Sequence, residues 1–210
     1  MVSITRQTWM VVSLLGASVI ASPAAQANTL NATYNFQSPV GELGTTQSYT
    51  VSGLTITAAG FSSSNFSIPN AALFDKTNGG DENGLGLKNS PDHEVTAGSY
   101  IRIGLPANIS AVSFTMDSST AGEGWKVYGS NSPTGSLTLL LSGTGEQSHS
   151  LAVYPYYFFT ATSGNVLLGS LTLVDPPPTP LPGALPLFGA GLGVIGFLGW
   201  RRKRSTHAKA

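Results

Sequence analysis

The sequence predicts an all-β protein whose main part is a single, jelly-roll-like β-sandwich. Short runs of alternating apolar and polar residues recur along the chain, and turn-forming residues separate them. Charged residues make up only 10% of the sequence, and no stretch of useful length has the helical period. Residues 28–174 are enough for one domain with a sizeable core, so we expect one sandwich rather than several domains.

The alternating runs place one set of side chains toward a core. Ile101 and Ile103 share a face, and so do Trp125 and Val127. The runs are residues 33–37, 49–58, 100–105, 112–116, 125–129, 137–141, 151–155 with the aromatic run 156–159, and 166–174. Ser52-Gly53 interrupts the second run. Eight to ten strands at this spacing are typical of a β-sandwich of the jelly-roll kind.

Charge is distributed unevenly along the chain. The formal net charge is zero, yet residues 28–180 contain all ten acidic residues and only four cations, which leaves them at about −6. An acidic domain of this kind argues against nucleic acid as a partner. The chain has no cysteine, which excludes disulfides and a cysteine nucleophile.

The N-terminal residues have the pattern of a secretory signal peptide. Arg6 provides a short basic region, residues 9–20 are apolar, and Ala25-Gln26-Ala27 is a small-x-small cleavage site. The apolar run is too short for a membrane helix. We therefore expect a signal peptide at residues 1–27, removal by signal peptidase, and a mature start at Asn28.

The C-terminal residues combine a spacer, an apolar span and a basic cluster. Residues 175–182 are rich in proline and favour extended polyproline II. Residues 183–200 carry no charge and as a helix would reach roughly 27 Å, close to the thickness of a bilayer core. Arg201, Arg202, Lys203 and Arg204 would stop transfer, so residues 201–210 form a predicted cytoplasmic tail. The alternative is a buried core helix.

The order of these C-terminal features resembles the PEP-CTERM sorting signal of Gram-negative bacteria. Thr179-Pro180-Leu181-Pro182-Gly183 is similar to the variant that has Val-Pro-Leu-Pro-Ala, from which it departs at Thr179 and Gly183. The resemblance implies a substrate of exosortase, with Pro180, Leu181 and Pro182 as its processing motif. It also implies transient residence in the inner membrane, then release to the cell surface or the medium, and association with exopolysaccharide or biofilm matrix.

Residues 75–94 are unusually acidic and rich in glycine. Asp81, Glu82, Asp92 and Glu94 lie among asparagines, and calcium prefers six to eight such oxygen ligands. The segment does not match the EF-hand spacing. We therefore name these four residues as candidate ligands of calcium, with an empty, solvated acidic loop as the alternative. No other cofactor is expected.

Two short stretches resemble elements of known sandwich domains. Residues 83–87 followed by 92–95 look like a Gly-Leu-Gly…Asp-x-Glu-Ile element common in PEP-CTERM sandwich domains. Residues 125–131 look like a strand of galactose-binding-like jelly rolls. Tyr128 and Tyr156 are candidate glycan contacts, because an aromatic ring can stack on the apolar face of a sugar while its hydroxyl stays in water. Burial in the core is the alternative for each aromatic residue.

An enzymatic function finds little support in the sequence. Ser90-Pro91-Asp92-His93 contains the residue types of a catalytic triad, but sequence neighbours rarely form one, and no Gly-x-Ser-x-Gly motif is present. Glu146 and His149 do not match a metal-binding pattern. We therefore expect a non-catalytic, exported surface protein. A surface enzyme acting on polysaccharide and a structural coat protein without a ligand remain the alternatives.

Overall fold

The computed structural model describes residues 29–77, 82–117, 122–176, 188–189 and 191–197. Residues Asn28–Pro178 form one compact unit. Outside it, the described residues 188–189 and 191–197 are helical. No helix among the described residues has the length and apolar character to cross a membrane. The predicted signal peptide, sorting motif and basic tail lie outside the described residues.

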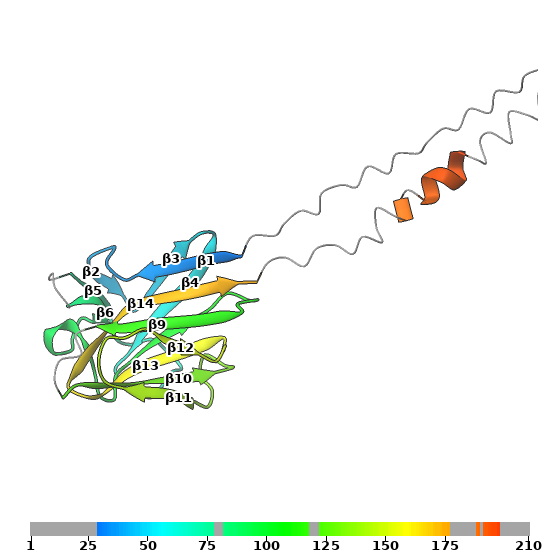
Figure 1. The fold of residues 1–210 in the computed structure, drawn as a ribbon. Coiled ribbons are helices and arrows are strands. Elements are labelled where there is room, and N and C mark those ends of the chain that lie inside the picture. The colour runs from blue at the N-terminus through cyan, green and yellow to red at the C-terminus, as the bar shows by residue number, and fades with distance from the viewer. Residues whose placement is uncertain (1–28, 78–81, 118–121, 177–187, 190, 198–210) are drawn as a thin grey trace, which may run out of the picture. The chain divides into compact units, whose positions relative to one another are not determined.

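The compact unit consists of two antiparallel sheets, as the alternating runs predicted (Figure 1). The eight-stranded sheet has the order β12 (His149–Leu151), β9 (Ala111–Asp117), β14 (Asn165–Asp175), β6 (Asn83–Leu87), β5 (Leu73–Thr77) and β2 (Gly41–Gly44). Two further strands, β1 (Leu30–Asn35) and β7 (Val95–Thr96), pair with β14. The six-stranded sheet has the order β11 (Thr138–Gly143), β10 (Gly124–Ser130), β13 (Tyr156–Ser163), β8 (Tyr100–Gly104), β4 (Leu54–Phe61) and β3 (Thr46–Val51).

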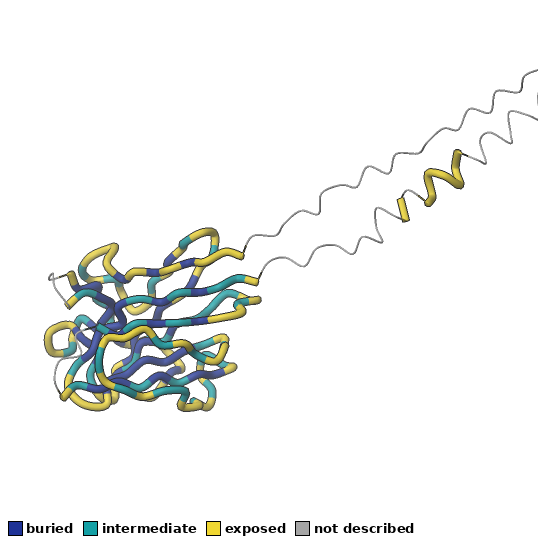
Figure 2. The backbone as a smooth tube through the Cα atoms, viewed as in Figure 1, coloured by how far each residue is buried: buried dark blue, intermediate teal, exposed yellow. Residues whose placement is uncertain are grey.

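The main core contains side chains from both sheets. Figure 2 marks the buried residues in dark blue along the strands. Trp125 and Val127 of β10 and Ile101 and Ile103 of β8 are fully buried, which confirms the faces predicted from alternation. The Trp125 ring packs edge-on against Phe114 of β9 at 5.3 Å between centroids. Its Nε1–H donates to the carbonyl of Gly145, so the indole is buried without an unpaired donor.

A second apolar cluster lies on the other side of the six-stranded sheet. Its buried members are Ala59, Phe61, Phe66 and Phe158. Phe66 comes from the segment between β4 and β5, and its ring lies 4.5 Å from that of Phe158. This segment therefore covers part of a sheet face that would otherwise be exposed, and it leaves the remainder open to solvent.

Two predictions about the strands are wrong. The leucine run 137–141 was expected to contribute a core face, but only part of it does. Leu141 lies opposite Val127 and packs against the main core, whereas a register shift in the β10–β11 pairing places Leu139 opposite Tyr128, where it is 52% exposed. Residues 75–94 were interpreted as a loop, but they include the end of β5, all of β6 and the 3-10 helix η1 (Pro91–His93). The acidic segment is therefore largely built into the eight-stranded sheet.

Candidate functional site

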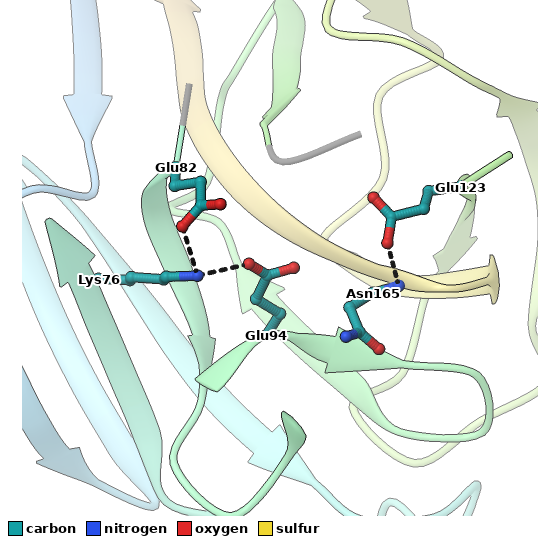
Figure 3. Close-up of polar contacts among 5 residues, drawn as sticks. All are labelled: Lys76, Glu82, Glu94, Glu123 and Asn165. Carbon is teal, nitrogen blue, oxygen red and sulfur yellow. Dashed lines mark hydrogen bonds and ion pairs between the residues drawn. The ribbon is translucent and has the colours of Figure 1, made fainter. Parts of the chain in front are cut away.

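The acidic segment is organised around a buried lysine (Figure 3). Lys76 lies on β5, and its Nζ is 2.7 Å from Glu94 Oε1 and 3.0 Å from Glu82 Oε2. The side chains of Lys76 and Glu94 are 6% and 5% exposed, whereas Glu82 is half exposed. Close by in Figure 3, Glu123 accepts a hydrogen bond from the backbone N–H of Asn165.

The segment that follows β6 buries Lys76. His93 of η1 stacks on Phe74 of β5 with 4.1 Å between ring centroids, and its Nδ1 lies 2.7 Å from the Lys88 carbonyl oxygen. Phe74 and Lys76 alternate with Leu73 and Asp75 on β5, so His93 and Glu94 cover the same side of the strand. Burial acts to lower the pKa of Lys76, but its hydrogen bonds to Glu94 and Glu82 outweigh burial and raise it.

The predicted calcium ligands are only partly brought together. Glu82 and Glu94 both contact the Lys76 ammonium, which supplies the positive charge that a calcium ion would have supplied. Asp92 is exposed on η1, and Asp81 lies outside the described residues. Among the residues that the structure describes, no three acidic or histidine side chains converge on a possible metal position. The described ligands do not fit calcium while Lys76 lies between them, and the four-residue site stays a prediction.

Asp75 belongs to the same acidic segment, but it faces the core. It is fully buried, and neither carboxyl oxygen has a hydrogen-bond partner among the described residues. Burial raises its pKa to about 7. The hydroxyl of Tyr49 on β3 is also buried and unpaired; burial and the nearby Asp75 raise the pKa of Tyr49. Asp75 is therefore a protonatable group between the sheets, not a member of a solvated loop.

The triad residue types of Ser90-Pro91-Asp92-His93 do not assemble a catalytic arrangement. Asp92 and His93 have positive φ values of 53° and 62°, in the left-handed region. The ring of His93 is engaged by Phe74 and the Lys88 carbonyl. This segment packs against the sheet, and its observed contacts are structural.

The two candidate glycan residues lie on one surface, which we call the tyrosine face. It is the outer side of the six-stranded sheet, where Tyr100, Tyr128 and Tyr156 are all partly buried against the second apolar cluster. Tyr128 faces away from Trp125 and Val127, as alternation predicted. Burial raises the pKa of the Tyr100 hydroxyl, and the nearby Tyr128 raises it further.

Cross-strand pairing sets the spacing of the tyrosine face. Tyr128, Phe158, Arg102 and Ala59 occupy successive positions in one row across β10, β13, β8 and β4. Tyr156 belongs to the next row, beside Gly104. A Cβ atom at Gly104 would lie 3.4 Å from the Tyr156 ring, so glycine leaves room for the ring to lie close to the sheet.

Arg102 is the cation at the centre of the tyrosine face. Its guanidinium carbon is 5.0 Å from the centre of the Phe61 ring and 5.9 Å from that of Tyr156. Nη1 donates a hydrogen bond to the Pro133 carbonyl, which fixes one side of the planar group. Burial lowers the pKa of the Arg102 guanidinium, while Tyr156 acts in the opposite direction. Aromatic contacts thus hold the Arg102 cation beside Phe61 and Tyr156.

Sequence reasoning named Tyr128 and Tyr156 but missed Tyr100, Arg102 and Lys76. Tyr100 and Arg102 alternate with Ile101 and Ile103, so the predicted strand already assigned them to the outer face. No comparable signal identified Lys76, whose burial depends on a segment that packs over β5.

The comparisons with known proteins do not assign the chain to a family. No protein-family model matches the sequence, and a search of curated proteins finds no significant match.

Proposed function

We propose that the chain is an exported, surface-sorted and non-catalytic β-sandwich protein that associates with exopolysaccharide, and that its sandwich is a jelly roll. The observation that carries the binding part of this proposal is the tyrosine face. Tyr128 and Tyr156, the two candidate glycan contacts named from the sequence, both lie on one side of one sheet together with Tyr100. Partly buried aromatic rings on a sheet form a platform on which the apolar faces of sugar rings can stack.

The sorting part of the proposal rests on the sequence. The chain carries a signal-peptide pattern, a proline-rich stretch with Pro180-Leu181-Pro182, an uncharged span and the cluster Arg201–Arg204. This order is the basis for proposing PEP-CTERM-type processing by exosortase. In the proposal, signal peptidase removes residues 1–27, and the chain resides briefly in the inner membrane before it reaches the surface or the medium.

Binding is tested with the full chain and an exopolysaccharide preparation. Tyr128→Ala and Tyr156→Ala should each weaken binding about fivefold or more, the usual effect of losing a central aromatic contact. Val40→Ala is the control, because Val40 is an exposed apolar residue outside the strands of the six-stranded sheet. If both tyrosine variants bind as tightly as the Val40 variant, the tyrosine face is not the binding surface.

Sorting is tested by mass spectrometry of surface material. The wild-type protein should lack the C-terminal basic cluster, whereas a Pro180→Ala, Pro182→Ala variant should keep it and stay in the membrane fraction. An intact C-terminus on surface-located wild-type protein would rule out sorting by C-terminal processing.

A further inference from the structure

The two sheets differ in charge. No strand of the six-stranded sheet contains Asp or Glu, whereas the strands of the eight-stranded sheet include Glu42, Asp75, Asp117 and Asp175. The domain as a whole is acidic, with ten acidic residues and four cations between positions 28 and 180. A sheet whose strands contain no carboxylate is therefore an exception in this chain.

Two of those four cations occupy the six-stranded sheet. Arg102 lies in the row of Tyr128, and Lys126 is on β10, two residues from Tyr128 and on the same side of the strand. The other two are engaged elsewhere, since Lys76 contacts Glu82 and Glu94 and Lys88 contacts Glu42. Among the described residues, neither Arg102 nor Lys126 forms an ion pair with a carboxylate.

We propose that the tyrosine face binds an acidic polysaccharide, whose anionic groups contact Arg102 and Lys126 while its sugar rings stack on Tyr128 and Tyr156. This rests on the proposed function and specifies the class of glycan. A neutral glycan would use only the rings and would leave both cations without an anion. A planar guanidinium that donates one of its N–H groups to Pro133 retains others, in a geometry that matches a carboxylate.

Nucleic acid is the other polymer that combines negative charge with stacking surfaces. Its phosphates lie so close together that nucleic-acid proteins generally neutralise several of them with clustered Lys and Arg. Two cations on a domain of about −6 provide little of this, and the remaining charge repels a polyanion of high charge density. An acidic polysaccharide with fewer charges per length is the better match.

The full chain is tested against polygalacturonate and the same polymer after its carboxyl groups have been reduced to alcohols. The two probes share a backbone and differ in charge. We expect tighter binding to polygalacturonate in about 0.01 M salt, and a weaker preference in about 1 M salt, where the screening length falls from about 30 Å to about 3 Å.

Two variants test whether Lys126 and Arg102 contact the carboxylates of the polymer. Lys126→Gln should weaken binding of polygalacturonate by about twofold to fivefold, as for an exposed ion pair, and should leave binding of the reduced polymer unchanged. Arg102→Gln should weaken the binding of polygalacturonate by about fivefold or more. Because Arg102 also contacts Phe61 and Pro133, its variant could disturb the fold, and Lys126→Gln keeps the test decisive. Lys88→Gln is the matched control and should change neither affinity.

The outcomes separate the two proposals. Binding to neither polymer would overturn the glycan-binding function and this inference with it. Equal binding to both polymers, or unchanged binding by Lys126→Gln, would overturn only the acidic preference. Tighter binding of a single-stranded oligonucleotide than of polygalacturonate would identify nucleic acid as the polymer and overturn the inference.

Discussion

Asp75 makes the stability of the domain depend on pH in an unusual direction. Its carboxyl group is 0% exposed and unpaired among the described residues, and burial raises its pKa from 3.8 to about 7. The folded state therefore holds the proton more tightly than the unfolded state does. The contribution of Asp75 to the free energy of unfolding is fully present below pH 3.8. It is lost as the pH rises to about 7, and above that it changes no further.

The size of the effect follows from the two pKa values. A folded pKa of about 7 against an unfolded value of 3.8 corresponds to about 4 kcal/mol between the two ends of this pH window. Asp75→Asn replaces the carboxyl group by an amide of similar shape that does not titrate. The variant should unfold with nearly the wild-type free energy near pH 4 and should be more stable than wild type near pH 8.

The assay is chemical denaturation of the full chain and of the variant across this pH range. Other titrating groups contribute equally to both proteins, so the difference between the two profiles reports Asp75. Asp92→Asn is the control, because Asp92 is exposed on η1, and its profile should follow wild type. A wild-type minus Asp75→Asn difference that stays constant from pH 4 to pH 8 would refute the reasoning.

Two further predictions concern the buried lysine. Lys76→Met should lower the free energy of unfolding by about 3–5 kcal/mol, because it leaves the buried Glu94 without its cation. Lys88→Met removes an exposed ion pair and should lower the free energy of unfolding by less than about 1 kcal/mol. Equal losses for the two variants in denaturant titrations would contradict this prediction. Calcium should leave the wild-type melting temperature unchanged relative to chelator, because Lys76 already neutralises Glu82 and Glu94. A rise of several degrees at millimolar calcium would instead support the site predicted from the sequence.

The alternation of apolar and polar residues correctly predicted which side chains face the core in the central strands. Ile101 with Ile103 and Trp125 with Val127 are buried as expected, because side chains of the opposite sheet cover that face of each strand. Leu139 repeats the same pattern and is exposed, because a register shift between β10 and β11 places it opposite the outward-facing Tyr128. An alternating pattern does not show where the pairing of two strands shifts, so it could not distinguish these cases.

The acidic segment shows a second limit of the sequence. Asp75 and Lys76 are adjacent on β5 and therefore face opposite sides, and both are buried. Asp75 is covered by the opposite sheet, and Lys76 by the segment that contains His93 and Glu94. Composition indicated solvent for both residues, since charged residues are seldom buried unless paired. The elements that bury Asp75 and Lys76 come from distant parts of the chain, so the local sequence does not predict their burial.

The pairing of the first and last strands has a mechanical consequence. Leu30 at the start of β1 lies opposite Asp175 at the end of β14, and β14 also pairs with β9 along most of its length. A force that pulls on Asp175 along the strand would act in shear on both ladders, because their hydrogen bonds run perpendicular to the strands. Many bonds would have to break together rather than one after another. A pull on this end of the domain would therefore meet more resistance than a pull that opened one ladder bond by bond.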